Sequence, residues 1–201
     1  MHTASDLIRL SLEIENGLTP AGDLTGLPGQ TAALLWASQH QAGYVTVFRE
    51  DIPATLRQQI LALGPGASFD EPIRVQQLLG QHTACRGIWS GEGYYFAAAP
   101  PAEQYADVVQ QAGAFVVLVD GEAVSRAWTQ DESAAAAELA VETREGFRRR
   151  GYARQVASAW AAHVIGQGKV AFYSHRRENE ASRRLAQNLG VTWYARSVTF
   201  S

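Results

Sequence analysis

Residues 139–156 read Leu-Ala-Val-Glu-Thr-Arg-Glu-Gly-Phe-Arg-Arg-Arg-Gly-Tyr-Ala-Arg-Gln-Val and contain the strongest structural signals of the chain. A short apolar run ends at Glu142, and a polar turn with three arginines then leads to Gly151. From Ala153 onward the apolar residues recur with helical spacing, which predicts one buried face of a helix. The stretch therefore predicts a strand, a loop and a helix, in that order.

The three arginines, Arg148–Arg150, directly precede the N-terminus of the predicted helix. The free N–H groups and the dipole make this end of a helix positive, so cations there repel unless an anion lies between them. Gly151 has no Cβ, so a phosphate group could approach its backbone N–H closely. The residues alone thus predict a phosphate-binding loop, and the alternative is a solvated helix start.

The same loop carries a family resemblance. Arg148-x-x-Gly151-x-Ala153 resembles the Arg/Gln-x-x-Gly-x-Gly/Ala signature of the GNAT N-acetyltransferase superfamily, in which this loop binds the pyrophosphate of coenzyme A. Residues 179–191 resemble the next signature of the family, Asn-x-x-Ser/Ala-x-x-Leu followed by Leu-Gly. The two matches stand in the family's order, and the resemblance covers about residues 114–200.

The fold class that the pattern and the resemblance imply is α/β (α+β). We expect a GNAT-type mixed central sheet flanked by helices over residues 98–201, the acetyl-CoA-binding catalytic core. Residues 1–97 are expected to form an added N-terminal α/β region that shapes the acceptor pocket.

Local patterns predict the elements of both parts. In the C-terminal part they predict a helix at 101–112, strands at 115–119, 123–129 and 136–142, a helix from 153, a strand at 170–173, a helix at 180–189 and a final strand. In the N-terminal part they predict helices at 4–16 and 31–40, a strand at 44–48, helices opened by Pro53 and Pro72, and strands at 85–89 and 94–96.

The composition argues against several classes of protein. A net charge of −3 gives no reason to expect nucleic-acid or anionic-membrane binding. The single cysteine, Cys85, cannot form an intramolecular disulfide, which fits a reducing, cytoplasmic compartment. There is no run of about 18 apolar residues and no basic-then-apolar start, so we expect neither a membrane span nor a secretion signal. The histidines and Cys85 show no metal-ligand spacing, so no metal is expected.

The resemblance implies which residues hold coenzyme A. The phosphate loop would supply Arg148, Arg149, Arg150, Gly151, Tyr152 and Ala153. The family usually has glycine at the position of Arg149, and this departure is expected to change the turn or to add a charge for the 3′-phosphate.

Further contacts follow from position in the family. Asn179 stands where the family has an asparagine near the pantetheine arm or the thioester, although it could equally be the N-cap of helix 180–189. Ser182 could touch the cofactor or cap its own helix. The backbone N–H of Ala140 or of Val141 would stabilise the oxyanion.

The catalytic candidates are Glu142, His175 and Tyr173. Glu142 ends the strand that enters the loop, and a buried carboxylate there would have a raised pKa suited to accepting a proton. Glu138 is on the same strand face and is interpreted as a surface charge. His175 is the next candidate base, with an ordinary loop histidine as the alternative.

A proton donor for the thiolate is harder to identify. The tyrosine that many relatives have seven residues after the asparagine is Ala186 here. This leaves Tyr152, Tyr173 and Tyr194 as candidates, or unassisted departure of the thiolate.

The sequence thus predicts an acetyl-CoA-dependent N-acetyltransferase, a monomer or homodimer that acetylates a primary amine of a small molecule. The alternatives are a protein amine as acceptor, or a non-catalytic acyl-CoA-binding sensor or interaction module. A Glu142 facing an enclosed pocket favours the enzyme, and a solvated Glu142 without an acceptor cleft favours the sensor.

Overall fold

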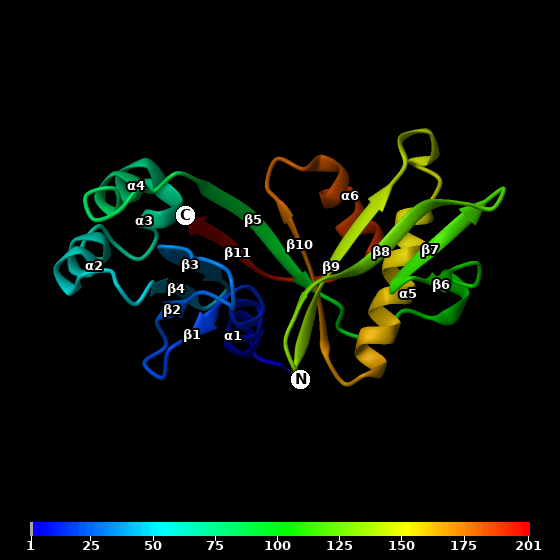
Figure 1. Cartoon of the computed structure of the whole chain (residues 1–201), viewed down its shortest axis with the longest axis horizontal. Coiled ribbons are helices and arrows are strands. Elements are labelled where there is room, and N and C mark those ends of the chain that lie inside the picture. Colours follow the sequence, from blue (N-terminus) through cyan, green and yellow to red (C-terminus); the bar gives the residue numbers. More distant parts are fainter. Residues whose placement is uncertain (1) are drawn as a thin grey trace. The chain divides into compact units, whose positions relative to one another are not determined.

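The computed structural model describes residues 2–201 and divides them into two compact units. One unit consists of Tyr194–Ser201 together with the described residues up to Glu92, and the other of Gly93–Trp193. The chain enters the second unit within strand β5 (Ile88–Tyr95) and leaves it at the start of β11 (Thr192–Phe200) (Figure 1). Each unit has a hydrophobic core of its own.

The N-terminal unit combines antiparallel strands with short helices. Its elements besides β5 and β11 are α1 (Ala4–Glu15), β1 (Gly17–Leu18), β2 (Leu24–Thr25), β3 (Leu35–His40), β4 (Gly43–Phe48), α2 (Ala54–Leu61), α3 (Ala67–Asp70) and α4 (Pro72–Leu79). β3 pairs with β4 on one side and with β11 on the other, and β1 and β2 form a separate hairpin. The apolar sides of α2 and α4 share one core with β3, β4 and β11. The strand predicted at 44–48 and the helices predicted after Pro53 and from Pro72 are confirmed.

The helix predicted at 31–40 is wrong, because residues 35–40 form the central strand β3. The four residues from Leu34 to Ala37 are all buried. A central strand that is covered on both faces shows an unbroken apolar run, and periodicity cannot separate such a run from a buried helix. The two strands predicted around residues 85–96 are in fact the one strand β5.

The C-terminal unit contains a mixed sheet. Its elements are the 3₁₀ turn η1 (Ala102–Gln104), β6 (Val109–Gln111), β7 (Ala114–Val119), β8 (Glu122–Glu132), β9 (Ala136–Thr143), the 3₁₀ turn η2 (Glu145–Phe147), α5 (Tyr152–Gly166), β10 (Val170–Arg176) and α6 (Glu180–Leu189). The strand order is β10-β9-β8-β7-β6, with β10 and β9 parallel and the other pairs antiparallel. The mixed α/β fold is confirmed, as are the strands predicted from residue 115 to residue 173 and the helix at 180–189.

The helix predicted at 101–112 is wrong. This segment holds only the turn η1 and the short edge strand β6, whose Val109 pairs with Val116 of β7. Val109 is 46% exposed, so it does not belong to the buried helix face that the spacing suggested. Ala112 and Gly113, both at positive φ, turn the chain directly into β7.

One face of this sheet carries both helices. α5 contacts β7, β8, β9 and β10, and α6 contacts β10 and α5 (Figure 1). The core between helices and sheet includes Leu139, Tyr173, Val156, Trp160 and Ala186. Trp160 is 1% exposed, and its Nε1–H donates to Thr129 Oγ1 at 3.0 Å, so α5 is fixed to β8 by packing and by a hydrogen bond.

None of the helices in the described residues 2–201 combines the length and the apolar character needed to cross a membrane.

Candidate active site

The loop between β9 and α5 leaves the start of α5 without a side-chain cap. Gly151 is the N-cap residue, in the left-handed conformation with φ 85°, and within the described residues no side-chain hydrogen bond caps the helix. A Cβ added at Gly151 would meet no atom of the described residues within 4 Å, apart from its chain neighbours and its own helix, so the space beside this backbone is open. Unsatisfied N–H groups at the N-terminus of a helix form a site for an anion. The expectation of a phosphate-binding loop therefore fits the local geometry.

Arg149 stands at the position where the family signature usually has glycine. Its φ is 61°, in the left-handed region that glycine adopts without strain. For any other residue this conformation costs roughly 1–2 kcal/mol. The glycine that is usual in the family would adopt this backbone conformation without strain. In this chain Arg149 is strained, but it adds a positive charge to the loop.

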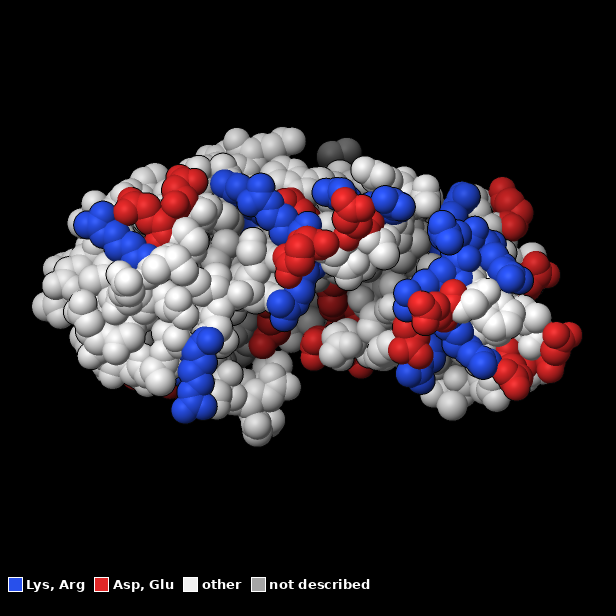
Figure 2. All heavy atoms as spheres, turned by 90° about the horizontal axis from the view of Figure 1, so that it is seen from above, with Lys and Arg blue, Asp and Glu red and all other residues white. Residues whose placement is uncertain are grey.

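The three arginines of the loop are exposed, and two of them donate to backbone carbonyls. Arg148 Nε–H donates to the carbonyl of Thr143 at 3.3 Å, and Arg150 donates to the carbonyl of Gly146 at 3.3 Å. The guanidinium of Arg150 also lies 5.2 Å from the ring centre of Phe147. On the right-hand side of Figure 2, where the C-terminal unit lies, cationic and anionic side chains stand close together.

Ion pairs do not occupy these three arginines. In the part of the chain that the structure describes, no carboxylate lies within 4.0 Å of Arg148, Arg149 or Arg150, although arginines elsewhere in the same unit are paired. Their charges therefore remain available to an anionic ligand beside the start of α5.

The two candidate oxyanion donors face opposite edges of β9. The N–H of Arg144 donates to the carbonyl of Val124 on β8, and in an antiparallel ladder such bonded residues alternate. The register of β8 and β9 therefore directs the backbone groups of Ala140 toward β8 and those of Val141 toward the opposite edge. Only the N–H of Val141 is thus turned toward the β10 side, where a ligand could reach it.

That edge of β9 is open because its ladder with β10 is short. The parallel strands pair only from Val170↔Ala136 to Phe172↔Glu138, and no pairing continues beyond this position. The second half of β9, from Leu139 to Thr143, thus offers backbone groups on its β10 side to another partner.

Glu142 is exposed rather than enclosed. It lies opposite Arg126 in the β8–β9 ladder, and Arg126 Nε is 2.6 Å from Glu142 Oε1. The Glu142 side chain is 56% exposed, and the Arg126 guanidinium also lies 4.9 Å from the ring centre of Trp128. The buried carboxylate expected at this position is not observed, and this arrangement is the one associated above with the sensor alternative.

Glu138 is the carboxylate that sequence reasoning undervalued. The surface-charge interpretation is wrong, because the residue is half-buried and its Oε1 accepts a hydrogen bond from the backbone N–H of Ser174 at 2.6 Å. The signal was present in the sequence, since Glu138 stands in the middle of the apolar run that forms β9 and a strand interior seldom places a carboxylate without a partner.

His175 is buried at the end of β10 with 5% of its surface exposed. Its Nδ1 lies 2.9 Å from the carbonyl of Arg176, which can only accept, so this nitrogen carries the hydrogen. In the described residues no partner is found for its Nε2, and its ring stacks on Tyr94 with 5.5 Å between centres. The predicted base is therefore enclosed by aromatic rings rather than exposed in a loop.

Tyr173 lies on the helix side of β10. Its hydroxyl donates to the carbonyl of Ser182 in α6 at 3.3 Å. Burial raises the pKa of Tyr173 to about 12, so the hydroxyl keeps its proton at neutral pH. Ala186, at the position of the family's usual tyrosine, is 2% exposed and belongs to the same core.

Asn179 is the N-cap of α6. Its side-chain oxygen accepts a hydrogen bond from the N–H of Ser182 at 3.1 Å. The capping interpretation is confirmed, and a contact of Asn179 or Ser182 with a cofactor stays a prediction.

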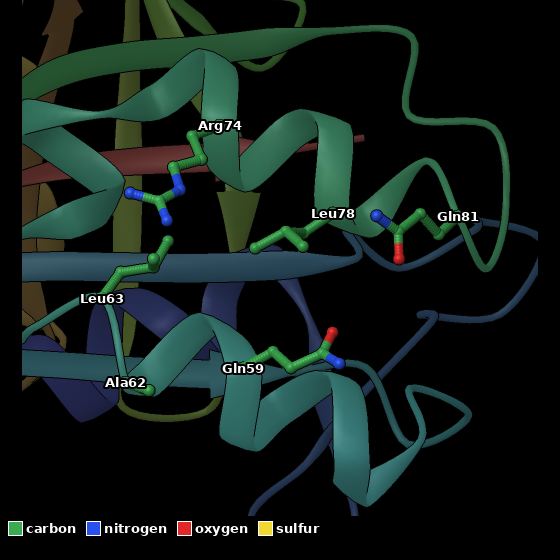
Figure 3. Close-up of a pocket in the computed structure, with 6 residues that line it drawn as sticks. All are labelled: Gln59, Ala62, Leu63, Arg74, Leu78 and Gln81. Carbon is green, nitrogen blue, oxygen red and sulfur yellow. The ribbon is translucent and has the colours of Figure 1, made fainter.

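A groove in the N-terminal unit lies between α2 and α4 (Figure 3). Leu63 and Leu78 line it together with Gln59, Ala62, Arg74 and Gln81. The guanidinium of Arg74 is already paired with Glu71 at 3.0 Å. None of the residues predicted to act in catalysis or cofactor binding lines this groove.

No group of three or more His, Cys, Asp or Glu side chains within residues 2–201 is arranged to hold a metal ion.

Comparison with known proteins bears on the C-terminal unit. Residues 102–196 match the family model described as GNAT acetyltransferase. These residues belong to the GNAT acetyltransferase family. The GNAT segment contains both signatures, and it includes β9, the arginine loop, α5, β10 and α6.

Several solved structures are similar to the chain at low identity. One, a GNAT-family acetyltransferase from Colwellia psychrerythraea, is 12% identical over 100% of this chain and 97% of its own, with a TM-score of 0.48. A protein assigned to the GNAT acetyltransferases from Novosphingobium aromaticivorans is 17% identical over 58% of this chain and only 65% of its own, with a TM-score of 0.47. A GCN5-related N-acetyltransferase-like protein from Streptococcus suis is 13% identical over 84% of both chains, also with a TM-score of 0.47.

All three TM-scores are below 0.5, so the family assignment rests on the sequence match over residues 102–196. No curated protein sequence matches the chain.

Proposed function

We propose that the protein is an N-acetyltransferase that moves the acetyl group of acetyl-CoA to a primary amine of a small molecule. The observation that carries the proposal is the uncapped start of α5, with Gly151 at φ 85° and three arginines that lack carboxylate partners in the described chain. The family of residues 102–196 supplies the type of reaction.

The residues of the loop suit the anionic part of coenzyme A. The first N–H groups of α5, from Gly151, Tyr152 and Ala153, would hold the pyrophosphate, because the helix dipole and the N–H groups both favour negative charge there. The guanidinium groups of Arg148, Arg149 and Arg150 would bind the remaining phosphate oxygens.

The open edge of β9 suits the extended arm of the same molecule. A chain that carries amide groups can pair with unpaired strand groups, as an added strand does. The groups on offer are the carbonyl of Leu139 and the backbone groups of Val141, and they lead along β9 toward the loop. Bound acetyl-CoA would supply the thioester that the amine attacks.

The N–H of Val141 is the proposed oxyanion donor. It faces the β10 side of β9, whereas the N–H of Ala140 faces β8. A fixed backbone donor aimed at the developing negative charge stabilises the transition state, and no side-chain substitution removes it.

Proton transfer is assigned to ionisable groups of β9 and β10, the strands that flank this edge. The amine arrives from solvent, and of the two candidate bases Glu142 is exposed while His175 is buried. We therefore place Glu142 first as proton acceptor, directly or through water, with Arg126 fixing its carboxylate. The Tyr173 hydroxyl, which stays protonated at neutral pH, is the candidate donor to the thiolate.

An acceptor screen tests the proposal. Acetyl-CoA is incubated with the protein and a panel of small primary amines, and free thiol is followed over time. Acceptor-dependent thiol release that saturates with one class of amine supports the enzyme. If acetyl-CoA at millimolar concentration gives no heat of binding and no thiol release, the proposed function is wrong.

The non-catalytic acyl-CoA sensor is the second candidate, and two observations favour it. Glu142 is solvated and engaged by Arg126, and Ala186 replaces the usual tyrosine. Acetyl-CoA binding without thiol release for any small amine or for a lysine-containing peptide would select this alternative. Thiol release with the peptide alone would make a protein amine the acceptor.

The remaining parts of the proposal are a cytoplasmic location, which rests on the single Cys85, and a monomer or homodimer as the active form.

A further inference from the structure

The ladder between β9 and β10 stops at a side chain. From the bond between the N–H of Val170 and the carbonyl of Ala135, every second residue of β10 directs its backbone groups at β9. By this alternation the next hydrogen bond of the ladder would run from the N–H of Ser174 to the carbonyl of Leu139. It donates instead to Glu138 Oε1, at 2.6 Å.

The carboxylate is a strong substitute for a strand partner. At 2.6 Å the bond from the N–H of Ser174 to Glu138 Oε1 is shorter than the roughly 2.9–3.0 Å typical of N–H···O hydrogen bonds. The N–H of Ser174 is satisfied by a side chain of β9 rather than by its backbone, so β10 gains little from further backbone pairing with β9. The registered pairing ends at Phe172↔Glu138, directly before this bond.

The early end of the ladder leaves backbone groups of β9 unpaired. The carbonyl of Leu139 and the N–H of Val141 lie on the edge that β10 no longer covers. If the carboxylate at residue 138 were absent, Ser174 could pair with Leu139, and the strands could close over the edge on which the ligand is proposed to lie.

We infer that Glu138 is a positioning residue that keeps β9 and β10 apart and so keeps the ligand-facing edge of β9 open. The inference rests on the proposed function, since the ligand is the extended arm of acetyl-CoA. Glu138 acts here as a hydrogen-bond acceptor on the protein's own backbone and takes no part in proton transfer to or from the amine.

The experiment compares two substitutions of Glu138 by calorimetric titration with acetyl-CoA, with circular dichroism as the check on folding. Glu138→Gln keeps an oxygen that can accept from Ser174, and its affinity should stay within about threefold of the wild type. Glu138→Val removes the acceptor and favours strand pairing, and its affinity should fall at least about tenfold, the worth of one hydrogen bond. Amide exchange at Ser174 should remain slow in both variants. Its N–H donates to the glutamine in Glu138→Gln and to the carbonyl of Leu139 in Glu138→Val.

Three outcomes would overturn the inference. Equal affinity in wild type and Glu138→Val means that the edge does not depend on this bond. A tenfold loss of affinity in Glu138→Gln means that charge, rather than the bond to Ser174, is what matters. A large loss of kcat for Glu138→Gln in the thiol-release assay, with unchanged acetyl-CoA affinity, would make Glu138 a base. If Glu138→Val does not fold, Glu138→Ala, which also lacks the acceptor, is measured against the same expectation.

Failure of the inference differs from failure of the proposed function. A wild type that does not bind acetyl-CoA contradicts the function itself, whereas a wild type that binds while all Glu138 variants bind equally contradicts only the role of Glu138.

Discussion

Glu138 and Glu142 stand on the same face of β9, four residues apart, in different surroundings. Glu138 is half-buried and binds the backbone of β10 through Ser174. Glu142 is more than half exposed and binds a side chain, Arg126, on β8. Because β10 pairs only with the first half of β9, the neighbouring strand, rather than residue type or strand face, decides which carboxylate is enclosed.

The two halves of β9 differ in the same way as these two residues. The first half is tied into the sheet on both edges, and the second half has an open edge and leads into the arginine loop. Substitutions in the core that supports the sheet should therefore change stability, and substitutions along the second half and the loop should change binding or turnover.

The largest effect is expected for the core below the sheet. Trp160→Ala removes a buried indole and its bond to Thr129, which should lower the free energy of unfolding by about 3–5 kcal/mol. Urea denaturation measures this loss. Trp160→Phe is the matched control, which keeps most of the volume and should lose clearly less. A loss below about 1 kcal/mol in Trp160→Ala would show that α5 is not anchored there.

The second effect concerns turnover at the exposed carboxylate. An alkyl ammonium has a pKa near 10, so only about one amine in a thousand is unprotonated at neutral pH. Glu142→Gln should lower turnover about a hundredfold, leave acetyl-CoA affinity unchanged, and recover as the pH rises. Steady-state kinetics from neutral to high pH measures this profile.

Arg126→Gln is the matched control for that variant, because it keeps the carboxylate and removes only its partner. It should lose clearly less turnover than Glu142→Gln, because the base remains and only its positioning is loosened. Full activity of Glu142→Gln at every pH would exclude Glu142 as the base and make His175 the next residue to substitute.

The third effect separates binding from folding at the loop. Any side chain at residue 151 is strained at φ 85°, so Gly151→Ala and Gly151→Glu should both lose about 1–2 kcal/mol of stability. Only the glutamate places negative charge at the proposed phosphate site, so it should bind acetyl-CoA at least about tenfold more weakly than the alanine variant. Calorimetry on both variants decides this, and equal affinities would place the pyrophosphate elsewhere.

The smallest effect is a pH dependence from β10. Burial raises the pKa of Tyr173 from 10.0 to about 12. Below pH 10 both the folded and the unfolded chain hold this proton, and between about 10 and about 12 only the folded chain does. The contribution to stability is therefore lost as the pH rises through this window. Urea unfolding of the wild type should show this decline, and Tyr173→Phe should show less of it. Identical alkaline slopes in the two proteins would contradict the burial of this hydroxyl.

The parts of the molecule that the sequence predicted well carry strong local signals. Gly151 and Gly190 mark the start of α5 and the end of α6, and the apolar runs of β7 and β9 lie between clear turns. The GNAT signatures add a fixed order to these elements. The same signals predicted the tight turn before α5, since the left-handed backbone at Arg149 and Gly151 is a local property, and phosphate binding at this loop stays a prediction.

The parts that were predicted wrongly depend on neighbours distant in sequence. Residues 35–40 form a strand because β4 and β11 pair with them, and Val109 forms an edge strand because Val116 lies opposite. The environments of Glu138 and Glu142 depend on where β10 stops pairing, which no pattern within β9 records.

We propose above that acetyl-CoA binds along the open edge of β9 and at the start of α5. Hydrogen exchange of the wild-type protein with and without saturating acetyl-CoA tests it most directly. Binding there should slow exchange of the amide of Val141 and of the amides of residues 149–154, with Ala140 unchanged because its N–H already faces β8. Unchanged exchange at these amides, or protection confined to the groove between α2 and α4, would contradict it.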